Sequence, residues 1–98
     1  MNDLLLVRPE AQADLAEAQK WYEQLAAGLG HEFVEAVDDV LASIIRNPLG
    51  FPVVRKTARR ALTKRFPYGV FYLVEEHAVI VLAVLHQARN PELWSRGA

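Results

Sequence analysis

The 98-residue chain contains no cysteine, which excludes disulfide bonds and thiolate ligands for a metal ion. No basic segment precedes the first apolar residues and no small-residue cleavage site follows them, so we expect no secretory signal peptide. No apolar run approaches the roughly 20 residues needed to cross a bilayer. These absences predict a cytoplasmic protein without a membrane partner.

The hydrophobic content of 52% is well above that of a disordered chain and predicts a packed globule. A chain of 98 residues favours one domain, which we place over residues 1–98. The net charge of −1 hides a division between two halves. Residues 1–47 hold nine acids and three bases, whereas residues 48–98 hold eight bases and three acids. The C-terminal half is therefore basic and suited to an acidic partner.

The pattern of apolar residues predicts an α+β fold, a helical hairpin on a small, mainly antiparallel sheet in the order β-α-α-β-β-β. Residues 4–7 are a short apolar run typical of a strand. An apolar stripe at helical spacing then runs from Pro9 towards a stop at Gly28, and a second stripe covers residues 30–46. Asn47-Pro48 ends this second helix, because proline disfavours helical geometry in the preceding residue.

After residue 48 the period changes to that of strands. Alternation over residues 59–66 predicts a strand that places Arg60 and Lys64 on one face and Arg59 and Arg65 on the other. Residues 70–74 and 78–85 then predict a β-hairpin around residues 75–77. The last strand is apolar on both faces, as a covered central strand would be.

Taken together, these segments resemble the RelE/ParE toxin superfamily. The similarity lies in DLAEAQKWYEQLAAGLGHEFVEAV, in the NP stop with FP after it, in RRALTKRFPYGVFY and in VLHQARNPELW. The resemblance covers nearly the whole chain in the right order. It implies a toxin neutralised by an antitoxin, and one of two activities. ParE-like members inhibit DNA gyrase, whereas RelE-like members are metal-independent endoribonucleases that cut messenger RNA on the ribosome.

Six cations within eleven residues form the most informative local feature, which we name the basic cluster: Arg55, Lys56, Arg59, Arg60, Lys64 and Arg65. The cluster is interpreted as a surface for phosphate or for an acidic protein. The alternative is a solvated edge strand that its charges protect from aggregation. Sequence-specific DNA binding by this chain is not expected, because no recognition helix carries these residues.

An endoribonuclease would need a base, an acid and cations on the scissile phosphate. His86 could serve as the base or acid, and the scissile phosphate could be held by Arg60, Lys64, Arg65 and Arg89. Of these cations, Arg65 and Arg89 are the ones we assign to the catalytic set with His86. The alternative for His86 is a hydrogen-bonded structural residue. RelE-like nucleases also finish with a C-terminal tyrosine, and the tail here offers Trp94 instead. This departure favours a ParE-like gyrase inhibitor over a nuclease, and a non-toxic relative that only binds a partner stays open.

Two tryptophans are candidate interface anchors, since aromatic side chains serve well in that role. Trp21 lies at the border of the first helical stripe, and Trp94 lies near the end of the chain. The alternative for both is packing within the fold. His31 and His77 have no paired ligand spacing, so we expect no metal site, and the sequence indicates no cofactor.

Overall fold

A computed structural model describes residues 4–88 of the chain. Two long helices and five strands follow one another, with a single 3-10 turn (η1) between the helices and the second strand. The elements are β1 (Leu4–Val7), α1 (Pro9–Leu25), α2 (Leu29–Arg46), η1 (Pro48–Gly50), β2 (Val53–Arg55), β3 (Ala58–Leu62), β4 (Tyr68–Glu75) and β5 (Ala78–His86).

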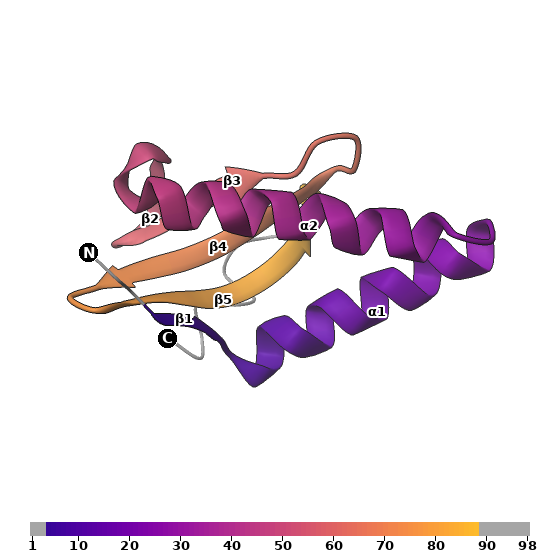
Figure 1. Cartoon of the computed structure of the whole chain (residues 1–98), viewed down its shortest axis with the longest axis horizontal. Helices are drawn as coiled ribbons and strands as arrows, with labels where there is room; N and C mark the ends of the chain where they lie inside the picture. Colours follow the sequence, from indigo (N-terminus) through magenta and orange to yellow (C-terminus); the bar gives the residue numbers. More distant parts are fainter. Residues whose placement is uncertain (1–3, 89–98) are drawn as a thin grey trace.

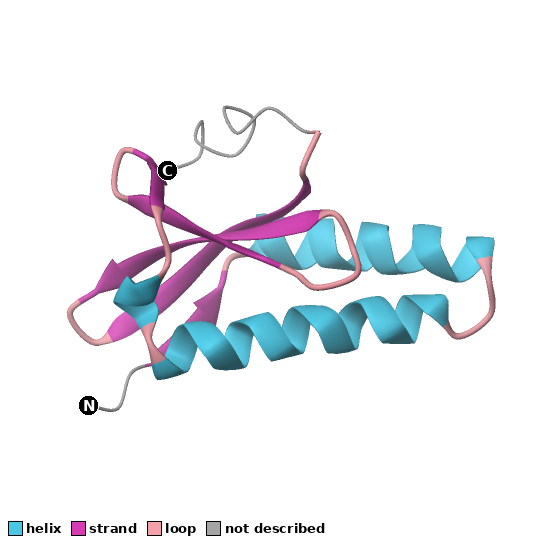
Figure 2. Cartoon of the chain, turned by 90° about the horizontal axis from the view of Figure 1, so that it is seen from above, coloured by secondary structure: helices cyan, strands magenta, loops and turns pink. Residues whose placement is uncertain are grey.

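The five strands form one sheet in the order β1-β5-β4-β3-β2. Strand β1 runs parallel to β5, and the remaining neighbours are antiparallel. Both helices lie on the same side of this sheet, as Figures 1 and 2 show from two directions. The predicted α+β fold, with a helical hairpin on a mainly antiparallel sheet, is confirmed. Strand β2 is an addition, so the order is β-α-α-β-β-β-β.

The two helices approach closely where they are joined. Gly28 has a φ of 87°, a left-handed conformation that suits glycine and reverses the chain. The Glu23 carboxylate accepts hydrogen bonds from the backbone N–H groups of Gly28 and Gly30, at 2.9 and 3.0 Å. At Gly30 a Cβ atom would lie 2.7 Å from the carbonyl oxygen of Gln19. Glycine at residue 30 therefore permits the close contact between the helices.

The main hydrophobic core fills the space between the helices and the sheet. Four aromatic rings occupy its centre: Tyr22, Phe33, Phe66 and Tyr68, with neighbouring centroids 4.9 to 6.0 Å apart. A smaller buried cluster comprises Phe71, Ala83 and Leu85. Phe71 precedes the core residue Tyr72 in the same strand, so this second cluster lies on the sheet face away from the helices. Strand β5 is thus buried on both faces, as predicted.

The strand predicted over residues 59–66 is too long. Strand β3 ends at Leu62, and a loop follows in which the buried Thr63 hydroxyl donates a hydrogen bond to the carbonyl oxygen of Phe66 at 2.7 Å. Arg65 takes a left-handed conformation with a φ of 73°, which turns the chain before Phe66 enters the core. The alternation of faces therefore stops at Leu62, and Lys64 and Arg65 lie in the loop.

Candidate functional site

The basic cluster does not form one continuous surface, because its members point in different directions. Arg59 lies on the helix side of the sheet, where its Nη1 donates hydrogen bonds to the carbonyl oxygens of Phe51 and Leu49, at 2.6 and 3.3 Å. These hydrogen bonds connect the end of η1 with β3. Arg59, predicted to bind a partner, is therefore engaged in holding the fold together.

Arg60 points to the opposite face of the sheet. Its side chain crosses Gly69, where a Cβ atom would lie 3.1 Å from both Cγ and Cδ of Arg60. Its Nε is buried and makes no hydrogen bond within residues 4–88. The neighbouring strand contributes Arg55, which is half-buried. The Nε atoms of both arginines are buried, so these two side chains are less accessible than the exposed cations of the cluster.

The remaining cations of the cluster are exposed. Lys56 occupies the turn between β2 and β3 with a φ of 53°. Arg65 forms an ion pair with Glu32 of α2, and its guanidinium carbon lies 5.4 Å from the centre of the Phe66 ring. Arg65 and Lys64 line a cavity of about 530 Å³ together with residues of α2. The exposed part of the cluster thus comprises the β2–β3 turn and the rim of this cavity.

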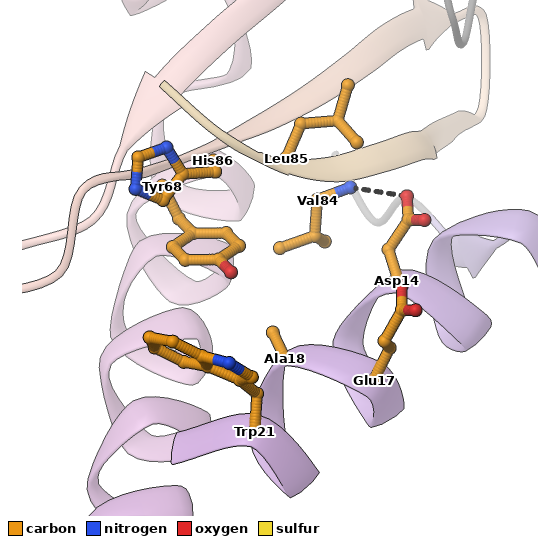
Figure 3. A pocket seen from close by; sticks show the side chains of 8 residues that line it. All are labelled: Asp14, Glu17, Ala18, Trp21, Tyr68, Val84, Leu85 and His86. Atoms are coloured by element: carbon orange, nitrogen blue, oxygen red, sulfur yellow. Dashed lines mark hydrogen bonds between the residues drawn. The ribbon is translucent and has the colours of Figure 1, made fainter. Parts of the chain in front are cut away.

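His86 lies elsewhere, at the end of β5, in a cavity of about 410 Å³ between that strand and α1. We call this cavity the α1–β5 pocket; it is lined by Asp14, Glu17, Ala18, Trp21, Tyr68, Val84, Leu85 and His86. The His86 ring makes an edge contact with Tyr68 at 5.4 Å between centroids. Its Nδ1 accepts a hydrogen bond from the backbone N–H of Ala88 at 3.0 Å. Figure 3 shows the imidazole extending away from the two carboxylates.

Two of the residues proposed for RNA cleavage, His86 and Arg65, do not lie together in the fold. His86 and Arg65 line two different cavities, and Arg89 lies outside the described residues. The α1–β5 pocket around His86 contains two carboxylates and, among its described lining residues, no lysine or arginine. Within the described part of the chain, no phosphate-binding set surrounds His86.

Trp21 lies at the mouth of the α1–β5 pocket, with 54% of its surface exposed. It packs edge-on against Tyr22 at 5.1 Å between ring centroids, so its inner side supports the core while its outer side faces solvent. The sequence analysis named Trp21 but missed Asp14 and Glu17. The three residues follow at spacings of three and four, which places them on one face of a helix. Trp94 lies outside the described residues.

Electrostatic shifts in the described residues accompany structural contacts. Hydrogen bonds from the Gly28 and Gly30 backbone lower the pKa of Glu23. Burial raises the pKa of Tyr72, and the nearby charge of Arg59 partly opposes that rise. Residues 4–88 contain no group of three or more potential metal ligands. The same residues include no helix long and apolar enough to span a membrane.

Comparison with known proteins identifies the family of this chain and supports its fold. A family model described as the ParE toxin of the type II toxin–antitoxin system parDE matches residues 5–91. The chain belongs to the ParE toxin family. This places it among the toxins of type II toxin–antitoxin systems and within the RelE/ParE superfamily, as its sequence motifs predicted. No curated protein is similar enough in sequence to be matched.

Two solved structures share the fold of this ParE-family toxin. A chain of the chromosomal ParDE system from P. aeruginosa is 18% identical with a TM-score of 0.68, covering 86% of this chain and 95% of that one. A chain of the toxin–antitoxin complex RelBE2 from Mycobacterium tuberculosis is 16% identical with a TM-score of 0.60, covering 88% of this chain and 99% of that one. At these identities, the likeness extends to the fold.

Proposed function

We propose that this ParE-family toxin arrests bacterial growth in the cytoplasm by inhibiting DNA gyrase, and that a cognate antitoxin neutralises it. The ParE model matches residues 5–91, and the observation that carries the choice of target is the separation of His86 from Arg65. General acid–base cleavage of RNA requires a base and phosphate-binding cations at one site. Asp14 and Glu17 are the acids among the described lining residues of the α1–β5 pocket, and the His86 imidazole extends away from both.

The test is pulsed expression of the toxin in a bacterial host without its antitoxin gene. Mapping of new RNA 5′ ends is combined with a DNA-damage reporter and with supercoiling assays on purified gyrase. We expect growth arrest, a DNA-damage response, inhibited supercoiling and intact messages. Discrete cuts within translated messages would overturn the proposal in favour of an endoribonuclease. Normal growth with neither signal would identify a non-toxic binding relative.

His86 provides an internal check on this choice. If the histidine supports the β4–β5 pairing through Tyr68 and performs no chemistry, a His86→Gln variant keeps its toxicity. A nuclease that used His86 as base or acid would lose about 100-fold or more in activity. Growth arrest by the variant at equal expression level is therefore the expected result.

Part of the antitoxin is proposed to be acidic and to contact the exposed cations of the basic cluster. Lys56 and Lys64 are the clearest candidates, because both are exposed and neither makes a hydrogen bond or ion pair within residues 4–88. A Lys56→Glu/Lys64→Glu variant is expected to bind the cognate antitoxin at least about tenfold more weakly at low salt. The matched control is Lys20→Glu, an exposed lysine of α1 outside the cluster. Equal affinities for both variants would exclude this contact.

A further inference from the structure

The α1–β5 pocket exists because β1 is shorter than its neighbour. The four residues of β1 pair only with Ala78–Val81, whereas β5 continues to His86. Beyond Val81 the edge of β5 therefore faces α1 instead of another strand. The Asp14 carboxylate accepts a hydrogen bond from the backbone N–H of Val84 at 3.1 Å, and Figure 3 shows this bond at one side of the pocket. A side chain of α1 thus takes the place of a strand neighbour.

The chemistry of the lining suits a cation. Asp14 and Glu17 lie one helical turn apart in the same cavity, and Glu17 is exposed and makes no hydrogen bond or ion pair within residues 4–88. The rings of Trp21 and Tyr68 form the opposing walls in Figure 3, and aromatic faces attract cations through their quadrupole. Carboxylates combined with aromatic faces are a setting that arginine fits well, since its planar guanidinium both stacks and donates in pairs.

The exposed apolar surface beside the pocket is larger than one inserted side chain could cover. Leu25 follows Trp21 by one helical turn, and 59% of its surface is exposed. The two residues continue the pocket as an apolar strip along α1. A free cation would leave this strip uncovered, whereas a polypeptide that inserts one basic side chain would also cover Trp21 and Leu25. Tryptophan is moreover a residue type that often dominates protein–protein binding energy.

We propose that the α1–β5 pocket receives a basic side chain, an arginine by its chemistry, from the antitoxin, whose neighbouring residues cover Trp21 and Leu25. This inference rests on the proposed function, because that function supplies the protein partner. This contact differs from the one proposed at Lys56 and Lys64, because it lies elsewhere on the toxin and involves a positive charge of the antitoxin. The partner's positive charge lies beside Glu17, while its acidic residues contact the basic cluster.

The test uses the full-length toxin and the antitoxin encoded beside it, with the dissociation constant measured by calorimetry. Glu17→Gln removes a charge from the pocket, and Glu17→Lys reverses it. The matched controls are Glu10→Gln and Glu10→Lys, which change an exposed acid of the same helix outside the pocket. We expect Glu17→Gln to weaken binding about threefold to tenfold and Glu17→Lys by more, with both controls within about twofold of wild type.

Charge exchange identifies the partner residue. Each arginine and lysine of the antitoxin is replaced by glutamate and tested against Glu17→Lys. Recovery of binding by one such replacement, with no recovery against Glu10→Lys, supports the proposal. Affinities for the Glu17 variants equal to those of the Glu10 variants would overturn it and leave the antitoxin contact at the basic cluster standing. If the unsubstituted toxin does not bind the antitoxin at all, the proposed neutralisation by that antitoxin is wrong. The proposed occupation of the α1–β5 pocket would then be wrong as well.

Discussion

Replacement of Arg59 by methionine tests whether this member of the basic cluster serves the fold or only a partner. Methionine keeps an unbranched apolar side chain and removes the guanidinium. The substitution abolishes the hydrogen bonds that Nη1 donates to Phe51 and Leu49, at 2.6 and 3.3 Å. The first is short and partly buried, and the second is long and exposed. Most of the lost stability should therefore come from the contact with Phe51.

The expected magnitude follows from the character of that contact. Hydrogen bonds to a charged group contribute about 1.5–3 kcal/mol when one partner is removed. We take about 1.5–2 kcal/mol, since solvent can reach part of the site. For a domain of 60–100 residues, 1 kcal/mol shifts Tm by roughly 4–8 °C. The Arg59→Met variant should therefore melt about 6–16 °C below the wild type.

Lys56→Met is the matched control, because it removes one positive charge from the same cluster at an exposed turn. Lys56 makes no hydrogen bond or ion pair within residues 4–88, so its replacement should change stability by no more than about 0.5 kcal/mol. Thermal melting and urea unfolding, both followed by circular dichroism, provide the comparison. Melting temperatures for the two variants within about 2 °C of each other would refute the structural role of Arg59.

Three further predictions concern the packing around the site. Tyr72→Phe removes a 2.6 Å hydrogen bond to the backbone carbonyl of Pro48 and should lower the free energy of unfolding in urea by about 1 kcal/mol. The control is Tyr22→Phe, because the Tyr22 hydroxyl donates no hydrogen bond within residues 4–88. This control should lower the free energy of unfolding by less than half as much. Because the pKa of Glu23 is lowered in the fold, its stabilisation is present above pH 4.5 and is lost as the pH falls. The Tm difference between wild type and Glu23→Gln should therefore shrink between pH 6 and pH 3, and a constant difference would contradict this. Gly30→Ala should destabilise by about 1–3 kcal/mol in urea, because its Cβ would meet a backbone oxygen at 2.7 Å; an unchanged midpoint would mean that the helices separate freely.

The helices could be predicted closely from the sequence because their signals are local. Pro9 begins α1 as expected, and α2 begins at Leu29, one residue before the expected start, and ends at Arg46 before Asn47-Pro48. Strand β2 was missed, because three residues are too few to show a period. The overextended β3 has a different cause. Alternation continues through residue 66 in the sequence, but the Thr63 hydrogen bond to Phe66 ends the strand in the fold.

The site was harder to predict, because it depends on which faces of the helices and strands come together in the fold. Closeness in sequence suggested that the six cations act together, yet β3 divides Arg59 and Arg60 between two faces and the following loop directs Arg65 towards α2. Acids near a helix start, such as Asp14, are favoured by the helix dipole alone, so their presence in the sequence does not indicate a site. Only the end of β1 at Val7 reveals that Asp14 faces an open strand edge.

The folded chain brings its acidic and basic halves together, which constrains what a neutralising partner must carry. Arg65 of the basic half forms an ion pair with Glu32 of the acidic half, so some of the opposite charges neutralise each other within the fold. Exposed charge of both signs stays available on residues 4–88, including positive charge at Lys56 and Lys64 and negative charge at Glu17. A uniformly acidic antitoxin segment would be attracted to the first and repelled by the second. The antitoxin should therefore combine an acidic stretch with a separate basic residue, and mutations at the two places should weaken the complex additively because they share no contact.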